Sequence, residues 1–198
     1  MTFDYKSVIN DHIPQSGNRV TRWLGLTTLK LMGWKIKGAF APEPKAVFIG
    51  LPHTSNWDFI IFLSAMQAVG LKASWMMKKE AFFWPLAGLF KKLGGVPIDR
   101  KSSKGITAQM ADWFAANEKA YLGITPEGTR SKVETLKKGY LRIAYAAKVP
   151  VFLIGIDGTN KNVVVDKLWP LTGDIEVDNR DIKAYYDANY TGIRPHLG

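Results

Sequence analysis

The chain has 198 residues, of which 46% are hydrophobic and 12% aromatic, enough to bury the core of one domain. It has no cysteine, which excludes disulfides and thiolate metal sites and is typical of a reducing compartment. The net charge of +10 predicts attraction to anionic lipid, phosphate or nucleic acid. Because no nucleic-acid recognition motif accompanies that charge, we expect no nucleic-acid partner.

The first forty residues are expected to form an N-terminal helical segment, and residues 41–198 the main part of a single-domain protein. Residues 19–37 mix tryptophan and leucine with arginine and lysine, which is typical of a helix at a membrane interface. A helix packed on the domain explains the same pattern. Gly25 and Gly33 weaken either interpretation, so both stay open.

From residue 46 onward, apolar runs of strand length alternate with stretches of helical pattern. Strands are predicted at 46–50, 73–77, 96–98, 120–125 and 151–156, and helices at 57–69, 103–118 and 135–147. Residues 163–165 and 174–177 are expected to add edge strands. The alternation predicts an α/β fold, with a central mostly parallel or mixed sheet flanked by helices and an N-terminal helical appendage.

Residues 81–90 form an aromatic and apolar run with lysines on both sides. Such a run can dip into lipid, line an acyl-chain tunnel or, most simply, form a buried core segment. No run in the chain reaches the roughly 18 apolar residues that a spanning helix needs. No secretory signal pattern precedes residue 18. We therefore expect a cytoplasmic protein, peripheral on the inner face of the membrane.

His53 and Asp58 stand where the predicted strand 46–50 gives way to the predicted helix from residue 57. Ser55 or Asn56 can cap that helix, which places Asp58 in its first turn beside the loop that carries His53. A neutral imidazole can take a proton from an alcohol, and a carboxylate can orient it. A capped helix with a satisfied loop histidine is the simpler alternative.

A second polar cluster, residues 125–131, follows the predicted strand 120–125. Its last five residues, Glu127, Gly128, Thr129, Arg130 and Ser131, combine a guanidinium, two hydroxyls and a flexible backbone. Phosphate recognition uses that combination. A surface turn with an exposed arginine explains the cluster equally well when it is taken alone.

Four blocks, taken in order, make the chain resemble the glycerolipid acyltransferases typified by 1-acylglycerol-3-phosphate (lysophosphatidate) acyltransferase. The family's His-x4-Asp pair falls on His53 and Asp58, and its Glu-Gly-Thr-Arg-Ser block falls on residues 127–131. Residues 78–80 and 94–100 resemble its lysine block and its glycine-containing run ending in Ile-Asp-Arg. Residues 137–139 and 149–151 resemble the helix and the Val-Pro strand that follow.

The resemblance implies an O-acyltransferase in which His53 is the general base and Asp58 orients it. The acyl donor would be a thioester, acyl-CoA or acyl-carrier protein, and the acceptor a hydroxyl of a lysophospholipid such as 1-acylglycerol-3-phosphate. The chain has no Gly-x-Ser-x-Gly motif and no cysteine, which fits direct transfer without an acyl-enzyme. The residues that would bind the acceptor's anionic head group are Lys78, Lys79, Arg100, Glu127, Gly128, Thr129, Arg130 and Ser131.

Three alternatives stay open. The acceptor can carry another head group, as in a lyso-aminolipid, or the chain can bind lipid or acyl-CoA without turnover. A basic nucleic-acid module is the third. No cofactor is expected, and no metal, because His12, His53 and His196 lack the spacing of metal ligands.

Overall fold

The computed structural model describes residues 4–129 and 133–194. A seven-stranded mixed sheet divides the molecule, in the order β1-β7-β6-β2-β5-β3-β4. Neighbouring strands are parallel except β6 and β7. The strands are β1 (Lys35–Gly38), β2 (Lys45–Leu51), β3 (Ala73–Lys78), β4 (Gly95–Ile98), β5 (Ala120–Ile124), β6 (Val151–Asp157) and β7 (Asn162–Trp169).

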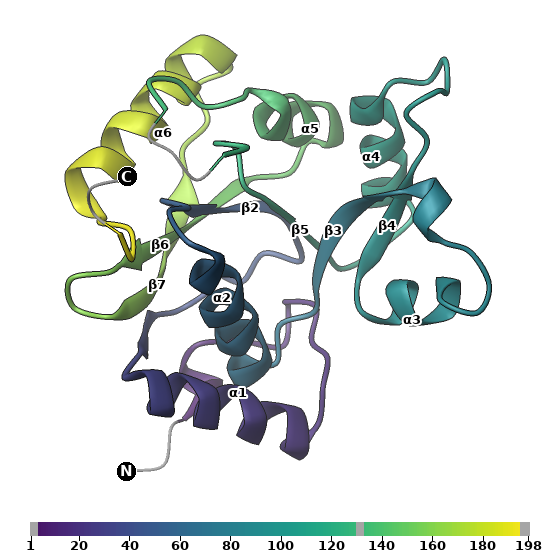
Figure 1. Ribbon diagram of the computed structural model, residues 1–198. Coiled ribbons are helices and arrows are strands. Elements are labelled where there is room, and N and C mark those ends of the chain that lie inside the picture. Colours follow the sequence, from purple (N-terminus) through teal and green to yellow (C-terminus); the bar gives the residue numbers. More distant parts are fainter. Residues whose placement is uncertain (1–3, 130–132, 195–198) are drawn as a thin grey trace.

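Helices cover both faces of this sheet (Figure 1). On one face lie α1 (Arg19–Met32) and α2 (Asn56–Val69), and on the other α4 (Ile106–Ala115), α5 (Gly139–Ala147) and α6 (Ile175–Asn189). The short helices are η1 (Tyr5–Ser7), η2 (Lys79–Ala81) and α3 (Ala87–Lys92). The architecture confirms the predicted α/β class with a mixed sheet.

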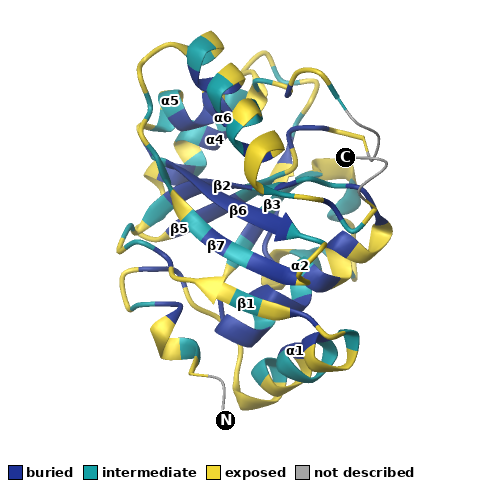
Figure 2. Ribbon diagram, turned by 90° about the vertical axis from the view of Figure 1, so that its left-hand side faces the viewer, coloured by how far each residue is buried: buried dark blue, intermediate teal, exposed yellow. Residues whose placement is uncertain are grey.

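The central strands are apolar along their whole length because they are covered from both sides. In β2 and β6 nearly every residue is buried, and Figure 2 shows this buried layer between helices whose outer sides are exposed. Two hydrophobic clusters fill the space, one under α1 and α2 and one under α4, α5 and α6.

Most of the predicted elements form within a few residues of their expected bounds. Residues 163–165 belong to β7, which lies between β1 and β6 and is not an edge strand, and residues 174–177 form no strand, so both edge-strand expectations are wrong. Asp174 caps the N-terminus of α6 instead, accepting hydrogen bonds from the backbone N–H groups of Glu176 (2.7 Å) and Val177 (3.2 Å).

The helix expected over residues 19–37 ends at Met32, because Gly33 adopts a left-handed conformation at its C-cap. Lys35–Gly38 forms the edge strand β1, so the segment to residue 40 is not wholly helical. Residues such as Ile13 and Leu29 join the core cluster on that face of the sheet. The division between residues 1–40 and 41–198 stays a prediction.

Helix α1 packs on the domain, as one of the two interpretations expected, and its role at a membrane interface stays a prediction. One side packs on α2, where Gly25 is buried and a Cβ atom there would lie 2.5 Å from the carbonyl oxygen of Ser64. The other side is exposed and apolar, with Leu31 83% and Trp23 61% exposed. Within residues 4–129 and 133–194, no helix combines the length and apolar character needed to cross a bilayer.

The run 81–90 is not a core segment, which corrects the simplest interpretation of it. None of the residues of α3 is buried, and Trp84 is 90% exposed. Together with β3 and β4, this run makes a lobe at one side of the sheet (Figure 1). We call residues 73–100 the β3–β4 lobe.

Candidate active site

The carboxyl ends of β2, β5, β3 and β4 meet at one edge of the sheet because these strands are parallel. In open α/β sheets, ligands bind in the crevice outside that edge. His53 follows the end of β2, Glu127 the end of β5, and Lys78 and Arg100 stand at the ends of β3 and β4. Every described residue proposed for the site thus lies along one edge.

The turn between β2 and α2 holds His53 and Asp58 together. Ser55 is the cap of α2, and its hydroxyl accepts a hydrogen bond from the backbone N–H of Trp57 at 3.2 Å. The carboxylate of Asp58 returns to the turn, where its Oδ2 accepts the backbone N–H groups of Thr54 and Ser55, both at 2.6 Å. This reciprocal capping fixes the carboxylate beside the loop.

The same Oδ2 atom of Asp58 lies 3.2 Å from Nδ1 of His53. Asp58 is almost fully buried, whereas the His53 side chain remains 23% exposed. When Nδ1–H donates to a carboxylate, Nε2 of the neutral ring is left as a proton acceptor. The predicted contact between the two side chains is present, in a form that suits a general base.

Glu127 makes a contact with this turn that the sequence did not indicate. Its Oε2 accepts the backbone N–H of His53 at 2.7 Å, across 74 positions of the chain. Burial raises the pKa of Glu127 to about 7, although the hydrogen bond from His53 and the charges of His53 and Lys183 act in the opposite direction. Glu127 therefore ties the β5 turn to the backbone that carries the base.

The other members of the second cluster are less defined. Gly128 and Thr129 continue the same turn and are exposed. Arg130 and Ser131 lie outside the described residues. Their expected role in binding an anionic head group stays a prediction.

The basic residues of the β3–β4 lobe stand apart from His53, because β5 separates β3 from β2. Lys79 Nζ lies 2.5 Å from Oδ2 of Asp99, whose Oδ1 accepts the backbone N–H of Lys101. These partners lower the pKa of Asp99, and the carboxylate raises the pKa of Lys79. The ion pair of Asp99 is thus with Lys79, and Arg100 is exposed together with Lys78.

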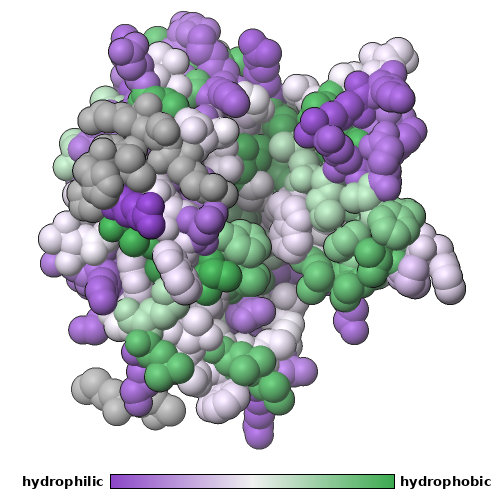
Figure 3. Space-filling view, in the orientation of Figure 1, coloured by the Kyte–Doolittle hydropathy of each residue, from purple (hydrophilic) through white to green (hydrophobic). Residues whose placement is uncertain are grey.

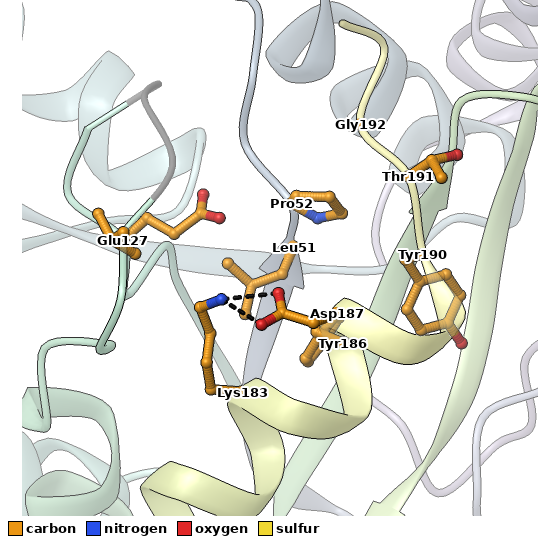
Figure 4. Close-up of a pocket in the computed structure, with 10 residues that line it drawn as sticks. Leu51, Pro52, Glu127, Lys183, Tyr186, Asp187, Tyr190, Thr191 and Gly192 are labelled. Carbon is orange, nitrogen blue, oxygen red and sulfur yellow. Dashed lines mark hydrogen bonds and ion pairs between the residues drawn. The ribbon is translucent and has the colours of Figure 1, made fainter. Parts of the chain in front are cut away.

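A cavity of about 160 Å³ lies behind the turn that carries His53. Figure 4 shows Leu51, Pro52 and Glu127 on one side of it and residues of α6 and of the segment after α6 on the other. Sequence reasoning missed the α6 side entirely, because this helix was not predicted. The Asp174 cap, followed by Glu176 and Asp178 in the first turn, was the available signal.

The described residues include no group of three or more His, Asp or Glu side chains placed to hold a metal ion. The arrangement instead offers a proton acceptor, a carboxylate that orients it and, farther along the edge, exposed cations.

The fold is similar to a known one. It resembles the crystal structure of the 1-acyl-sn-glycerophosphate (LPA) acyltransferase PlsC from Thermotoga maritima, with a TM-score of 0.56 and 16% sequence identity, covering 87% of this chain and 80% of that chain. A comparison with curated proteins gives no match.

The sequence carries the stronger finding. Residues 35–157 match the model of the acyltransferase family, which is more than half of the chain. The matched region contains His53, Asp58, the β3–β4 lobe and the turn after β5. With its fold and these residues, the chain belongs to the acyltransferase family.

Proposed function

We propose that the chain transfers a fatty acyl group from an acyl thioester to the hydroxyl of a lysophospholipid such as 1-acylglycerol-3-phosphate. The observation that carries this proposal is the contact of 3.2 Å between Nδ1 of His53 and Oδ2 of Asp58 in a family of acyltransferases. The LPA acyltransferase of similar fold supports the choice of acceptor.

In the proposed reaction, Nε2 of His53 takes the proton of the acceptor hydroxyl as the oxygen attacks the thioester carbonyl. Asp58 stabilises the imidazolium that forms. The tetrahedral intermediate collapses, the carbon–sulfur bond breaks, and the imidazolium returns its proton to the leaving thiolate. The products are the new ester and a free thiol, and no cofactor takes part.

The acceptor's phosphate would lie along the edge of the sheet toward the β3–β4 lobe. Lys78 and Arg100 are exposed at the ends of their strands, and an arginine can bind two phosphate oxygens at once. Lys79 would contribute less because Asp99 already neutralises it. Arg130 and Ser131 would complete the anion site from the turn after β5, beside Gly128 and Thr129.

A membrane surface would supply the lipid substrate. Figure 3 shows apolar side chains on one face of the molecule, over α1, α2 and the region of α3, on both sides of a hollow between the main body and the β3–β4 lobe. The exposed apolar residues of these elements are Val20, Trp23, Leu24, Leu31, Trp57, Phe59, Ile60, Phe83, Trp84, Leu89 and Leu93. With the net charge of +10, this face suits peripheral binding to anionic lipid at the inner side of a membrane.

A lyso-aminolipid or another lysolipid remains a second acceptor class, because the basic residues would bind any anionic head group. A protein that binds lipid or acyl-CoA without turnover would have no use for a base at His53. The carboxylate fixed beside that ring favours catalysis.

The test is release of free thiol from acyl-CoA and acyl-carrier-protein donors, with and without each lysolipid. Because the chain has no cysteine, a thiol-reactive dye reports only the released thiol. We expect release that depends on lysophosphatidate and falls by about 10²- to 10⁴-fold in His53→Ala. Equal release by the native protein and His53→Ala would overturn the role of His53, and thiol release with no dependence on any lysolipid would overturn the transfer.

A further inference from the structure

The segment that follows α6, residues 190–194, lies across the carboxyl end of the sheet and reaches the turn that carries His53. We call it the C-terminal strap. It lies beyond residue 157, where the match to the acyltransferase family ends.

The strap is anchored at its start. The hydroxyl of Tyr190 donates to Oδ2 of Asp166 on β7 at 2.8 Å. The carbonyl of Thr191 accepts the backbone N–H of Gly158 at 2.6 Å. In the preceding turn of α6, the buried hydroxyl of Tyr186 lies 3.1 Å from the carbonyl oxygen of Ile49 on β2. The strap is therefore fixed to β7 and to the turn between β6 and β7, and the helix that leads into it is fixed to β2.

The far end of the strap contacts Thr54. The backbone N–H of Arg194 donates to the hydroxyl of Thr54 at 3.1 Å. Gly192 packs so closely on Thr54 that a Cβ atom at residue 192 would lie 2.3 Å from the Thr54 methyl carbon. Thr54 itself is 2% exposed. The strap thus covers Thr54, which lies between His53 and Ser55, the N-cap residue of α2.

Thr54 connects the strap to the catalytic pair. Its backbone N–H donates to Oδ2 of Asp58, the atom that also lies beside His53. A displacement of Thr54 would move both the loop that carries the imidazole and one of the donors that hold the carboxylate.

A cavity next to the turn that carries His53 increases the importance of these hydrogen bonds. The cavity of about 160 Å³ separates the strap and α6 from Leu51, Pro52 and Glu127 (Figure 4). Where a loop borders a cavity, close packing does not hold it from that side. Besides the capping bonds of Asp58, hydrogen bonds from two other parts of the described chain hold the turn, from Glu127 at the backbone N–H of His53 and from the strap at Thr54.

We propose that the C-terminal strap positions the general base, with Gly192 and the backbone of Arg194 acting through Thr54. The proposal rests on the proposed role of His53. It assigns the strap no contact with either substrate. Loss of the contact between the strap and Thr54 should therefore lower kcat and leave the KM of the acceptor unchanged.

The experiment compares Thr54→Val with Thr54→Ser. Valine keeps the branched shape but removes the acceptor for Arg194 N–H, whereas serine keeps the hydroxyl. We expect kcat to fall by about tenfold to hundredfold in Thr54→Val, with the KM of lysophosphatidate unchanged, and serine to retain most of the native kcat. Equal values of kcat in the two variants would overturn the proposal.

A second pair of variants tests the strap from its own side. Gly192→Ala places a methyl group against Thr54, whereas Gly105→Ala adds the same group where no atom lies within 4 Å. We expect kcat to fall only in Gly192→Ala. Thermal melting shows whether each variant folds. If Gly192→Ala does not fold, the comparison of Thr54→Val with Thr54→Ser tests the proposal by itself.

Nitrogen NMR of the histidine rings gives a readout that does not depend on turnover. His53→Ala assigns the His53 signals among the three histidines. The native protein should show the Nδ1–H tautomer at His53, and Thr54→Val should mix the tautomers. An unchanged His53 tautomer in both Thr54→Val and Gly192→Ala would overturn the proposed role of the strap, even if no substrate were turned over. An altered tautomer without turnover would count only against the proposed function.

Discussion

The centre of the sheet and the β3–β4 lobe solve different problems at the same edge. In the centre, Asp58 and Glu127 are buried, and both accept backbone N–H groups of the turn that carries His53. In the lobe, Lys78 and Arg100 are exposed, and Trp84 extends into solvent. The first region holds atoms in fixed relative positions, whereas the second presents charge and apolar surface.

This difference teaches how the two halves of the proposed reaction are separated. Proton transfer depends on geometry within a fraction of an ångström, so it is built where the backbone is hydrogen-bonded from several sides. Attraction to a phosphate or a lipid surface tolerates movement, and long side chains at the surface suffice. Substitutions in the centre should affect kcat, and those in the lobe should affect binding.

The largest effect is expected for Asp58→Asn, which keeps the shape of the side chain and an oxygen for the capping hydrogen bonds. It removes the negative charge that stabilises the His53 imidazolium. We expect kcat to fall by roughly 10²- to 10⁴-fold with little change in the melting temperature, measured by thiol release and by calorimetry. A change in the KM of lysophosphatidate with kcat unchanged would contradict the expectation that substitutions in the centre of the sheet act on kcat.

A smaller effect, on binding, is expected for Arg100→Ala. A charge-assisted hydrogen bond contributes about 1.5–3 kcal/mol, so the KM of lysophosphatidate should rise about tenfold to hundredfold. The rate at saturation should stay the same, and Lys79→Ala should have a weaker effect because Lys79 is paired with Asp99. An acceptor without a phosphate serves as the control. If Arg100→Ala raised the KM of this control acceptor equally, Arg100 would not be binding the phosphate.

Trp84→Glu tests the apolar side of the lobe. Trp84 is 90% exposed, so the fold should not change, whereas binding to anionic vesicles should weaken by about tenfold through loss of apolar burial. Ala184→Glu, an equal charge change on α6 at the opposite face of the sheet, is the matched control in a flotation assay. Equal losses in the two variants would show an effect of charge alone.

The smallest effect concerns pH and Glu127. A carboxyl with a raised pKa in the folded state contributes stability below its ordinary pKa of 4.5, and that contribution is lost as the pH rises through about 7. Glu127→Gln removes this titration. The melting temperature of the native protein, minus that of the variant, should therefore fall by a few degrees from pH 4.5 to a pH above about 7. A difference that stayed level would contradict the raised pKa.

The contact between His53 and Asp58 could be predicted because it is local. Five positions and a capped helix start bring the two side chains together whatever the rest of the fold does. The contact between Glu127 and His53 could not, because it depends on β5 lying between β2 and β3. Chain order alone places β3 nearer to β2, and nothing in the sequence shows that β5 enters between them.

The alternating pattern predicted the central strands well because they are long, apolar and bounded by polar residues. It failed at α6, whose buried side chains include polar ones, Asp178 and Asn179 beside Ile182 and Tyr186. These polar residues interrupt the apolar stripe of the helix. The amide oxygen of Asn179 accepts the hydroxyl of Tyr140 at 3.0 Å, and its NH2 group donates to the carbonyl of Leu136 at 3.0 Å. Missing α6 also hid the strap that follows it.

Gly25 has a consequence for how α1 meets any surface. Because its absent side chain lets α1 approach the backbone of α2 at Ser64, the helix cannot turn about its own axis without a clash. Its exposed row, which includes Trp23 and Leu31, therefore points in one fixed direction. A helix that folds only on contact must lose conformational entropy as it binds, and α1 is already ordered, so association through this row avoids that cost.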